Sequence, residues 1–142
     1  LLTGPARGYV KAGLEKIGVP YRHVQLKRYQ DVARHYWALD LYLITSRDEG
    51  GPMALLESMA SGVPVVSTRV GMCADLLDGG ECGVLAEVDD VAGLVESAKK
   101  VLQDSSFRAT LVRNAGLLAQ NHDWSVIATR YYEEVYKPLL VT

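Results

Sequence analysis

Apolar residues along the chain form two kinds of segment. Short, continuous apolar runs bounded by turn residues are typical of buried strands, whereas apolar positions three or four residues apart are typical of helices. The expected strands are residues 1–3, 21–26, 41–45, 63–68 and 83–86. The expected helices are residues 5–17, 31–37 with Asp31 as cap, 52–61, a short helix ending near 77, 91–102, 105–120 and 125–136, the last ending at Pro138.

Strands that alternate with helices in this way require a parallel sheet with right-handed crossovers. The pattern therefore predicts an α/β fold, a Rossmann-like parallel sheet with flanking helices. The 142 residues, 49% of them apolar, suffice for one sizeable core, so we expect a single domain over residues 1–142. Ligands of such sheets bind beyond the carboxyl ends of the strands, where the loops 45–52 and 68–72 are expected.

The expected helix 52–61 has clear boundaries. Pro52 suits the first helical position, and Gly62 marks the point at which the helix must stop. The backbone amides at its start belong to Met53, Ala54 and Leu55. Because these amides point out of the positive end of the helix dipole, they predict a phosphate-binding site.

Two glutamates, separated by seven residues, flank this helix start. Glu49 precedes it, and Glu57 lies about a turn and a half inside it. A carboxylate beside an anion site is unfavourable for phosphate alone, because like charges repel. A ligand that carries hydroxyls on both sides of its phosphates, such as a nucleotide sugar, suits the arrangement better. The plainer alternative is an exposed loop acid and a surface helix acid.

The same segment carries a longer motif. It contains Thr45-Ser46, then Glu49-Gly-Gly-Pro52, then Leu56-Glu-Ser-Met-Ala-Ser-Gly-Val-Pro-Val-Val66, and weaker matches continue through Gly71, Asp75, Gly83 and Asp123-Trp-Ser125. This pattern resembles the retaining glycosyltransferases of family 4, which have the GT-B fold and a Glu-x7-Glu motif. The chain is similar to the carboxyl-terminal, donor-binding half of such an enzyme.

The resemblance implies roles for single residues. Glu49 would be the catalytic residue and would contact the hydroxyls of the donor sugar, while Glu57 would hold the ribose. The backbone at Leu26 and Lys27 would contact the nucleobase. The amides that would touch the sugar and the distal phosphate are those of Gly50, Gly51, Met53 and Ala54. Pro52 departs from the family pattern, which has a second glycine there, so one amide is lost and the sugar preference implied by the family does not carry over.

The implied activity is transfer of a sugar, with retention, from a nucleoside diphosphate sugar to an unknown acceptor in polysaccharide biosynthesis. No metal ion or other cofactor is expected. The chain is expected to be truncated at its amino-terminal edge and to lack the acceptor-side Rossmann-like domain, together with the Arg and Lys that neutralise the diphosphate. Leaving-group stabilisation needs such positive charge. The isolated piece should therefore bind weakly and fail to turn over. Exposed strand edges and apolar patches left by the missing half should also make it self-associate or be only marginally stable.

Charge and composition argue against nucleic-acid binding and against a membrane-spanning segment. A net charge of −2 and a pI near 5.9 give no case for nucleic acid as a partner, and the apolar runs are too short for a transmembrane segment. Cys73 and Cys82 are expected as free thiols, which favours a cytoplasmic location, with the full-length enzyme able to work at the membrane surface. Arg47 and Arg69 could meet phosphate or be solvated loop residues.

Three other functions fit the residues. A non-catalytic sugar-nucleotide-binding module would keep Glu57 and the helix start. A sugar-nucleotide epimerase with a GT-B-like fold would bind the same ligand, but no acid and base residues for it are evident. A structural interaction domain would bind no nucleotide.

The aromatic stripe of Trp124, Tyr131, Tyr132 and Tyr136 indicates core packing, with part of it as an exposed half-interface.

Overall fold

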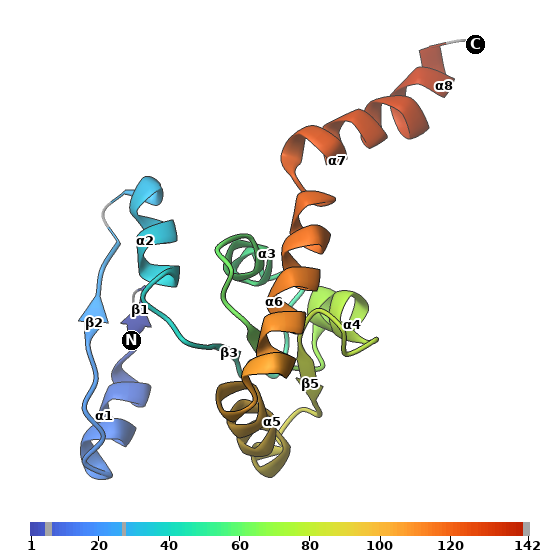
Figure 1. The fold of residues 1–142 in the computed structure, drawn as a ribbon. Coiled ribbons are helices and arrows are strands. Elements are labelled where there is room, and N and C mark those ends of the chain that lie inside the picture. The colour runs from blue at the N-terminus through green and yellow to red at the C-terminus, as the bar shows by residue number, and fades with distance from the viewer. Residues whose placement is uncertain (5–6, 27, 141–142) are drawn as a thin grey trace. The chain divides into compact units, whose positions relative to one another are not determined.

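The computed structural model describes residues 1–4, 7–26 and 28–140, and the chain divides into two compact units, Leu1–Leu39 and Asp40–Thr142 (Figure 1). Every strand pair in the described part of the chain is parallel, as expected. The strands form two sheets, one in each unit. One donor-binding domain over 1–142 stays a prediction.

The first unit is a small parallel pair with helices. Strand β1 (Leu2–Thr3) pairs with β2 (His23–Val24), and α1 (Gly8–Lys16) connects them. The expected strand 21–26 is thus only two residues long, matching the length of its partner. The imidazole Nε2 of His23 lies 2.7 Å from the carbonyl oxygen of Gly4, which ties the end of β1 to β2.

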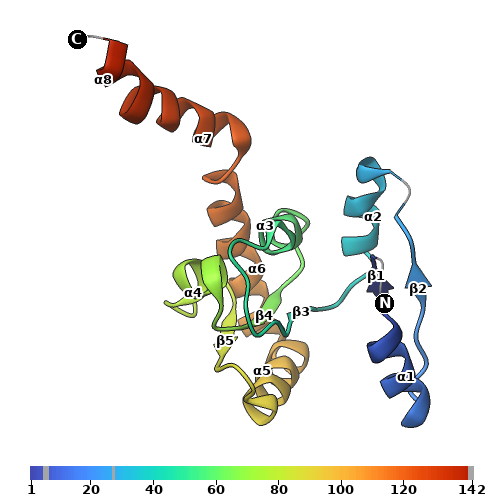
Figure 2. The same cartoon turned by 180° about the vertical axis from the view of Figure 1, so that it is seen from behind.

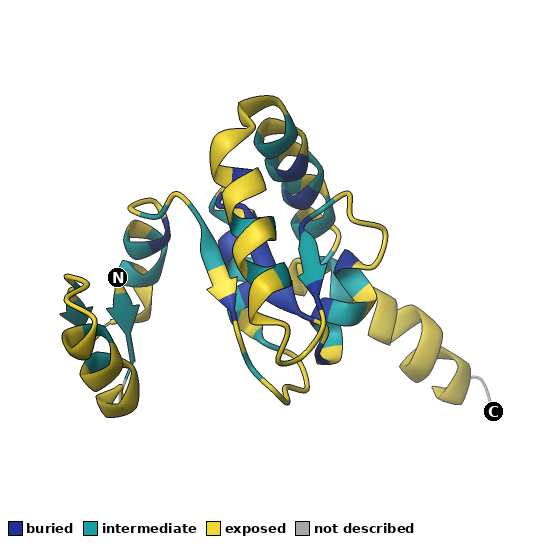
Figure 3. Ribbon diagram, turned by 90° about the horizontal axis from the view of Figure 1, so that it is seen from below, coloured by how far each residue is buried: buried dark blue, intermediate teal, exposed yellow. Residues whose placement is uncertain are grey.

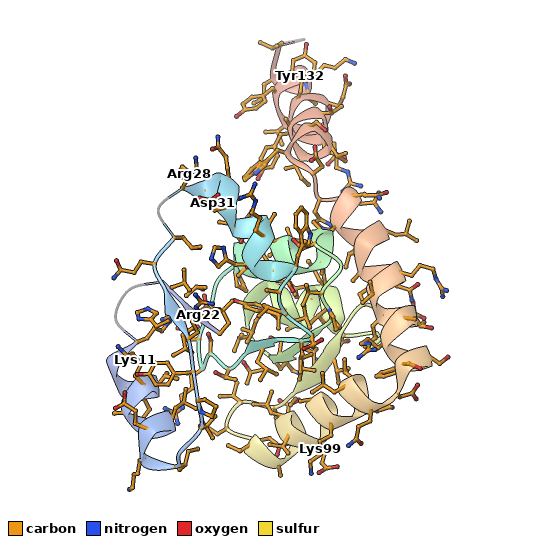
Figure 4. The ribbon with its side chains drawn as sticks, turned by 60° about the vertical axis from the view of Figure 1, so that its left-hand side comes forward. Lys11, Arg22, Arg28, Asp31, Lys99 and Tyr132 are labelled. Atoms are coloured by element: carbon orange, nitrogen blue, oxygen red, sulfur yellow. The ribbon has the colours of Figure 1, made fainter. Side chains whose placement is uncertain are left out.

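The start of the next helix differs from the expectation. A 3-10 turn, η1 (Tyr29–Asp31), precedes α2 (Val32–Tyr36), and Asp31 makes no side-chain cap. Its carboxylate instead accepts two hydrogen bonds from Arg28, Nε to Oδ2 at 3.0 Å and Nη2 to Oδ1 at 3.1 Å (Figure 4). The predicted cap was wrong because the guanidinium offers two charge-assisted bonds at once.

The second unit contains a three-stranded sheet in the order β3-β4-β5. Its strands are β3 (Tyr42–Ile44), β4 (Val65–Thr68) and β5 (Val84–Ala86). All four residues of β4 are buried, as expected for the segment 63–68, including the polar Ser67 and Thr68. In β3, Leu43 is 49% exposed, so the expectation of a fully buried strand was wrong there. Tyr42 and Ile44 share the face that packs on the core, whereas Leu43 points to the opposite face.

Helices cover both faces of this sheet (Figures 1 and 2). Val65 packs with α3 (Met53–Ala60) and α4 (Gly71–Leu77), whereas its neighbour Val66 points the other way and packs with α5 (Val91–Gln103). Helix α6 (Ser105–Gln120) contributes Ala115 to the first cluster and Leu111 to the second. Successive side chains of a strand point to opposite faces of the sheet, and both faces of β4 are buried.

Three aspartates fix the starts of the last helices. Asp90 accepts a bond from the amide of Gly93 at 2.8 Å, and Asp104 accepts one from Phe107 at 2.8 Å. Asp123 accepts one from Ser125 at 2.9 Å and begins α7 (Trp124–Tyr131). Each carboxylate satisfies an amide that the helix leaves without an internal partner. The helices 91–102 and 105–120 are thereby confirmed within one residue.

The carboxyl-terminal segment departs from two expectations. A π-helical turn, η2 (Tyr132–Tyr136), leads into α8 (Lys137–Leu140), so Pro138 lies inside a helix and does not end it. The wide π turn directly before Pro138 is a known means of accommodating a proline. No described residue of α7, η2 or α8 is buried, and Trp124 is 73% exposed (Figure 3). The core-packing interpretation of the aromatic stripe was therefore wrong.

Candidate functional site

Three connections leave the same edge of the three-stranded sheet, because its strands are parallel. They are residues 45–52 after β3, 69–70 after β4 and 87–90 after β5. Glu49 lies in the first connection, which leads directly into α3, the helix that carries Glu57. The expectation that the loops 45–52 and 68–72 lie at the carboxyl ends of the strands is confirmed.

The carboxylate of Glu49 has a local partner. The hydroxyl of Ser46 donates a hydrogen bond of 2.9 Å to Glu49 Oε1. Glu49 is exposed, and an ionised carboxylate has about four acceptor positions, so it can accept further hydrogen bonds from a ligand. Ser46 at the strand end thus orients the acid that the motif singles out.

The end of β4 holds this connection in place. Thr68, which is 2% exposed, donates its hydroxyl to the carbonyl oxygen of Ser46 at 2.6 Å, with Ile44 O at 3.4 Å. The amide of Met72, in the first turn of α4, donates to the carbonyl oxygen of Gly50 at 3.0 Å. Sequence reasoning did not find Thr68 or Met72, because both bonds join segments more than twenty residues apart.

The start of α3 corrects two details. Pro52 is the N-cap, with extended backbone at φ −68° and ψ 105°, and the helix itself begins at Met53. The amide of Leu55 donates to Pro52 O at 2.9 Å, so it is already engaged and is not available to a phosphate. Met53 and Ala54 are the first two residues of the helix.

Open space surrounds the two glycines before the helix. Gly50 and Gly51 are both exposed, and a methyl group added at either position would meet no atom within 4 Å. A ligand can therefore approach this stretch of backbone closely. Glu57, the fifth residue of α3, is half-buried. Its role toward a ribose, like the contacts of the amides to sugar and phosphate, stays a prediction.

The arginines at the sheet edge pair with acids. Arg47 Nε lies 2.7 Å from Asp89 Oδ1. Arg69 Nε lies 2.8 Å from Glu87 Oε1, and its Nη1 contacts Asp78. The hydrogen bonds with Asp78 and then Glu87 raise the pKa of Arg69 further above its ordinary value. Exposed pairs of this kind contribute little stability. The neighbouring carboxylates nevertheless offset the positive charge of both arginines in this structure.

Both cysteines are weaker acids than an ordinary thiol. Cys73 is buried in the core with Ile44 and Leu55, and burial raises the pKa of its thiol. Burial likewise raises the pKa of Cys82. Among the residues that the structure describes, no group of three His, Cys, Asp or Glu side chains could hold a metal ion. In that same part of the chain, no helix is both long and apolar enough to cross a membrane.

The expected nucleobase contacts belong to the first unit. Leu26 follows β2 and is exposed, and Lys27 lies outside the described residues. Nothing further places them against the second unit, so their role stays a prediction.

Comparisons with known proteins agree with this geometry. Residues 2–104 match the family model described as glycosyl transferases group 1. The lipopolysaccharide core biosynthesis mannosyltransferase LpsB of Rhizobium meliloti is 31% identical over 144 residues, which cover 97% of this chain and 41% of LpsB. The chain thus spans less than half the length of the curated relatives it matches.

Solved structures show the same fold. Sucrose-phosphate synthase from Thermosynechococcus elongatus has a TM-score of 0.81 at 22% identity, over 95% of this chain and 34% of that one. Anabaena HepE in complex with UDP-glucose has a TM-score of 0.75 at 23% identity, over 97% and 38%. The fold is that of the carboxyl-terminal half of GT-B enzymes, and the chain belongs to the group 1 family of glycosyltransferases.

Proposed function

We propose that this chain is the donor-binding part of a retaining, family 4 glycosyltransferase that takes a sugar from a nucleoside diphosphate sugar. The main support is one arrangement: the Glu49 connection is anchored to β4 and α4 at the carboxyl edge of the sheet and leads directly into the helix bearing Glu57. Two acids then flank an open stretch of backbone at a helix start.

Each group has a separate task in this proposal. Glu49 accepts hydrogen bonds from hydroxyls of the transferred sugar, and Glu57 accepts them from the ribose. The open backbone at Gly50 and Gly51, with the first amides of α3, faces the distal phosphate and the sugar. The bond between the anomeric carbon and the phosphate oxygen breaks, the acceptor oxygen bonds to that carbon on the same face, and the acceptor proton passes to the leaving diphosphate.

The donor is the substrate, and the proposal includes no metal ion or other cofactor. HepE binds UDP-glucose and LpsB is a mannosyltransferase, so the class of donor is supported while the base and sugar are left to experiment. The protein is expected to act in polysaccharide or lipopolysaccharide biosynthesis, from the cytoplasm.

A second part of the proposal is that residues 1–142 in isolation lack the positive charge that turnover needs. The diphosphate leaving group needs positive charge. Arg47 and Arg69, at the proposed edge, are already paired with Asp89 and with Asp78 and Glu87. We therefore expect residues 1–142 by themselves to bind a nucleotide weakly and to show no measurable turnover.

The test is donor consumption by the whole protein, with a panel of UDP- and GDP-linked sugars as donors and a panel of free and lipid-linked sugars as acceptors. Release of nucleoside diphosphate identifies the donor, and proton NMR of the product gives the configuration at the anomeric carbon. Retention supports the proposal. Inversion overturns the retaining assignment, an inverted hydroxyl in the free nucleotide sugar indicates an epimerase, and binding without consumption indicates a non-catalytic module.

A further inference from the structure

One glycine at the sheet edge has almost no room around it. Gly71 has φ +41°, in the left-handed region that side chains disfavour. A Cβ at this position would overlap the carbonyl oxygens of Glu49 and Gly50 and would lie 2.9 Å from the carbonyl carbon of Glu49. These neighbours are backbone atoms, which cannot rotate away as a flexible side chain can.

Two hydrogen bonds hold the same two segments together. The amide of Met72 donates to Gly50 O at 3.0 Å, and the hydroxyl of Thr68 donates to Ser46 O at 2.6 Å. The backbone of residues 46–50 is thus fixed at both ends by residues 68–72. Gly71 lies between the two anchor residues in the sequence, against the backbone of Glu49 and Gly50.

We infer that Gly71 is a positioning residue for Glu49: its lack of a side chain allows the close backbone packing that sets where the Glu49 carboxylate lies. Gly71 acts through Glu49 and need not touch the substrate. The catalytic consequence rests on the proposed function, whereas the packing itself does not. The two are therefore tested by separate measurements.

The chain offers a matched control. Gly80 also has a left-handed backbone, φ +68°, but a Cβ there would meet nothing within 4 Å. Gly80→Ala therefore introduces a comparable backbone strain without the collision. Any difference between Gly71→Ala and Gly80→Ala reports the contact with Glu49 and Gly50.

The first measurement is amide hydrogen exchange of Met72 in the whole protein, because that amide reports the bond to Gly50 directly. It should exchange roughly tenfold faster in Gly71→Ala and within about twofold of the natural protein in Gly80→Ala. Equal exchange in the two variants would show that Gly71 does not control this packing, and would overturn the inference whatever the enzyme does.

The second measurement is turnover of the donor identified by the sugar-nucleotide panel. Gly71→Ala should lower kcat about tenfold or more relative to Gly80→Ala, with UDP or GDP affinity changed less than about threefold. In a Glu49→Gln background, Gly71→Ala should lower kcat by less than about twofold, because both changes act through one group. Additive losses would mean that Gly71 does not act through Glu49. Full turnover by Glu49→Gln alone would instead refute the proposed role of Glu49 and leave the exchange result standing.

A second anchor covers the case in which Gly71→Ala does not fold. Thr68→Val keeps the shape of the side chain and removes the hydroxyl that holds Ser46, whereas Thr68→Ser keeps the hydroxyl. Thr68→Val should lower kcat about fivefold, whereas Thr68→Ser should have a kcat close to that of the natural protein. A Thr68→Val enzyme with the natural kcat would contradict the positioning of Glu49 by this segment.

Discussion

The side chain of Ser46 donates a 2.9 Å hydrogen bond to Glu49, three residues further along the same connection. This bond orients a carboxylate that is otherwise exposed, at the edge where β3, β4 and β5 end. If this carboxylate accepts hydrogen bonds from sugar hydroxyls as proposed, removing it should affect the chemical step more than nucleotide binding.

Glu49→Gln in the whole protein should lower kcat about a hundredfold and leave the affinity for free UDP or GDP nearly unchanged, because an interaction that strengthens in the transition state acts on turnover. Steady-state kinetics and calorimetry measure the two quantities. Ser46→Ala serves as a milder comparison and should lower kcat only several-fold. Parallel losses of nucleotide affinity and kcat would mean that Glu49 contacts the nucleotide.

Glu57→Ala should weaken UDP or GDP binding about tenfold, because the two ribose hydroxyls lose a charged acceptor, at a cost on the order of 1–3 kcal/mol. Glu96→Ala is the matched control, since it also removes a glutamate from a helix, on α5, where the side chain pairs with Lys99 on the surface. An unchanged dissociation constant in Glu57→Ala would refute the ribose role.

Two leucines of α6 provide a test of the core. Leu111 is 1% exposed, whereas Leu117 on the same helix is 58% exposed. Leu111→Ala should lower the free energy of unfolding by about 2–5 kcal/mol, and Leu117→Ala by less than about 0.5 kcal/mol. Urea denaturation followed by circular dichroism gives both values. Similar losses in the two variants would contradict the packing of α6 against β4 and α5.

The two thiols should react slowly and in a fixed order. Burial raises the pKa of Cys73 and of Cys82, so both hold less thiolate at neutral pH than an ordinary cysteine, and alkylation should accelerate as pH rises. Cys82 is only half-buried and should be alkylated by iodoacetamide before Cys73. Mass spectrometry of digested samples checks the order, and faster modification of Cys73 would show that the core around it opens readily.

Residues 1–142 in isolation should self-associate through the exposed apolar side chains of α7, η2 and α8. Trp124, Tyr132 and Leu140 are all more than half exposed there, and contiguous apolar surface favours association. Sedimentation across a concentration series should show a rising average mass. The double variant Trp124→Ser/Tyr132→Ser should shift the mass toward that of the monomer, and a natural chain that is monomeric throughout would refute this prediction.

Local chemistry made much of the fold predictable. The segment from Val63 to Thr68 predicted the buried strand β4, and apolar positions three or four residues apart predicted α5 and α6 within one residue. The cap predicted at Asp31 was wrong, since Arg28 binds its carboxylate. Pro138 failed the proline rule because a π turn precedes it.

The candidate site was predictable only in part. Glu49 and Glu57 stand out through their spacing around a helix start, but the anchors that hold Glu49 belong to distant segments. A sequence gives no sign that Thr68 will reach Ser46 or that Met72 will bond Gly50, because such contacts arise when parallel strands bring their ends together. The expectation that the amide of Leu55 would face a phosphate was wrong for a different, local reason: Pro52 is the cap residue, and its carbonyl oxygen accepts the hydrogen bond from Leu55 in a tight first turn.

The uneven space around the glycines also matters for redesigning the donor preference. Gly50 and Gly51 are surrounded by open space, so a mutant library at these two positions changes the surface offered to a sugar without disturbing the packed backbone. Gly71, one connection away, admits no such variation. A library that varies residues 50 and 51 and keeps residues 68–72 constant would therefore screen for new donor specificities on an unaltered backbone.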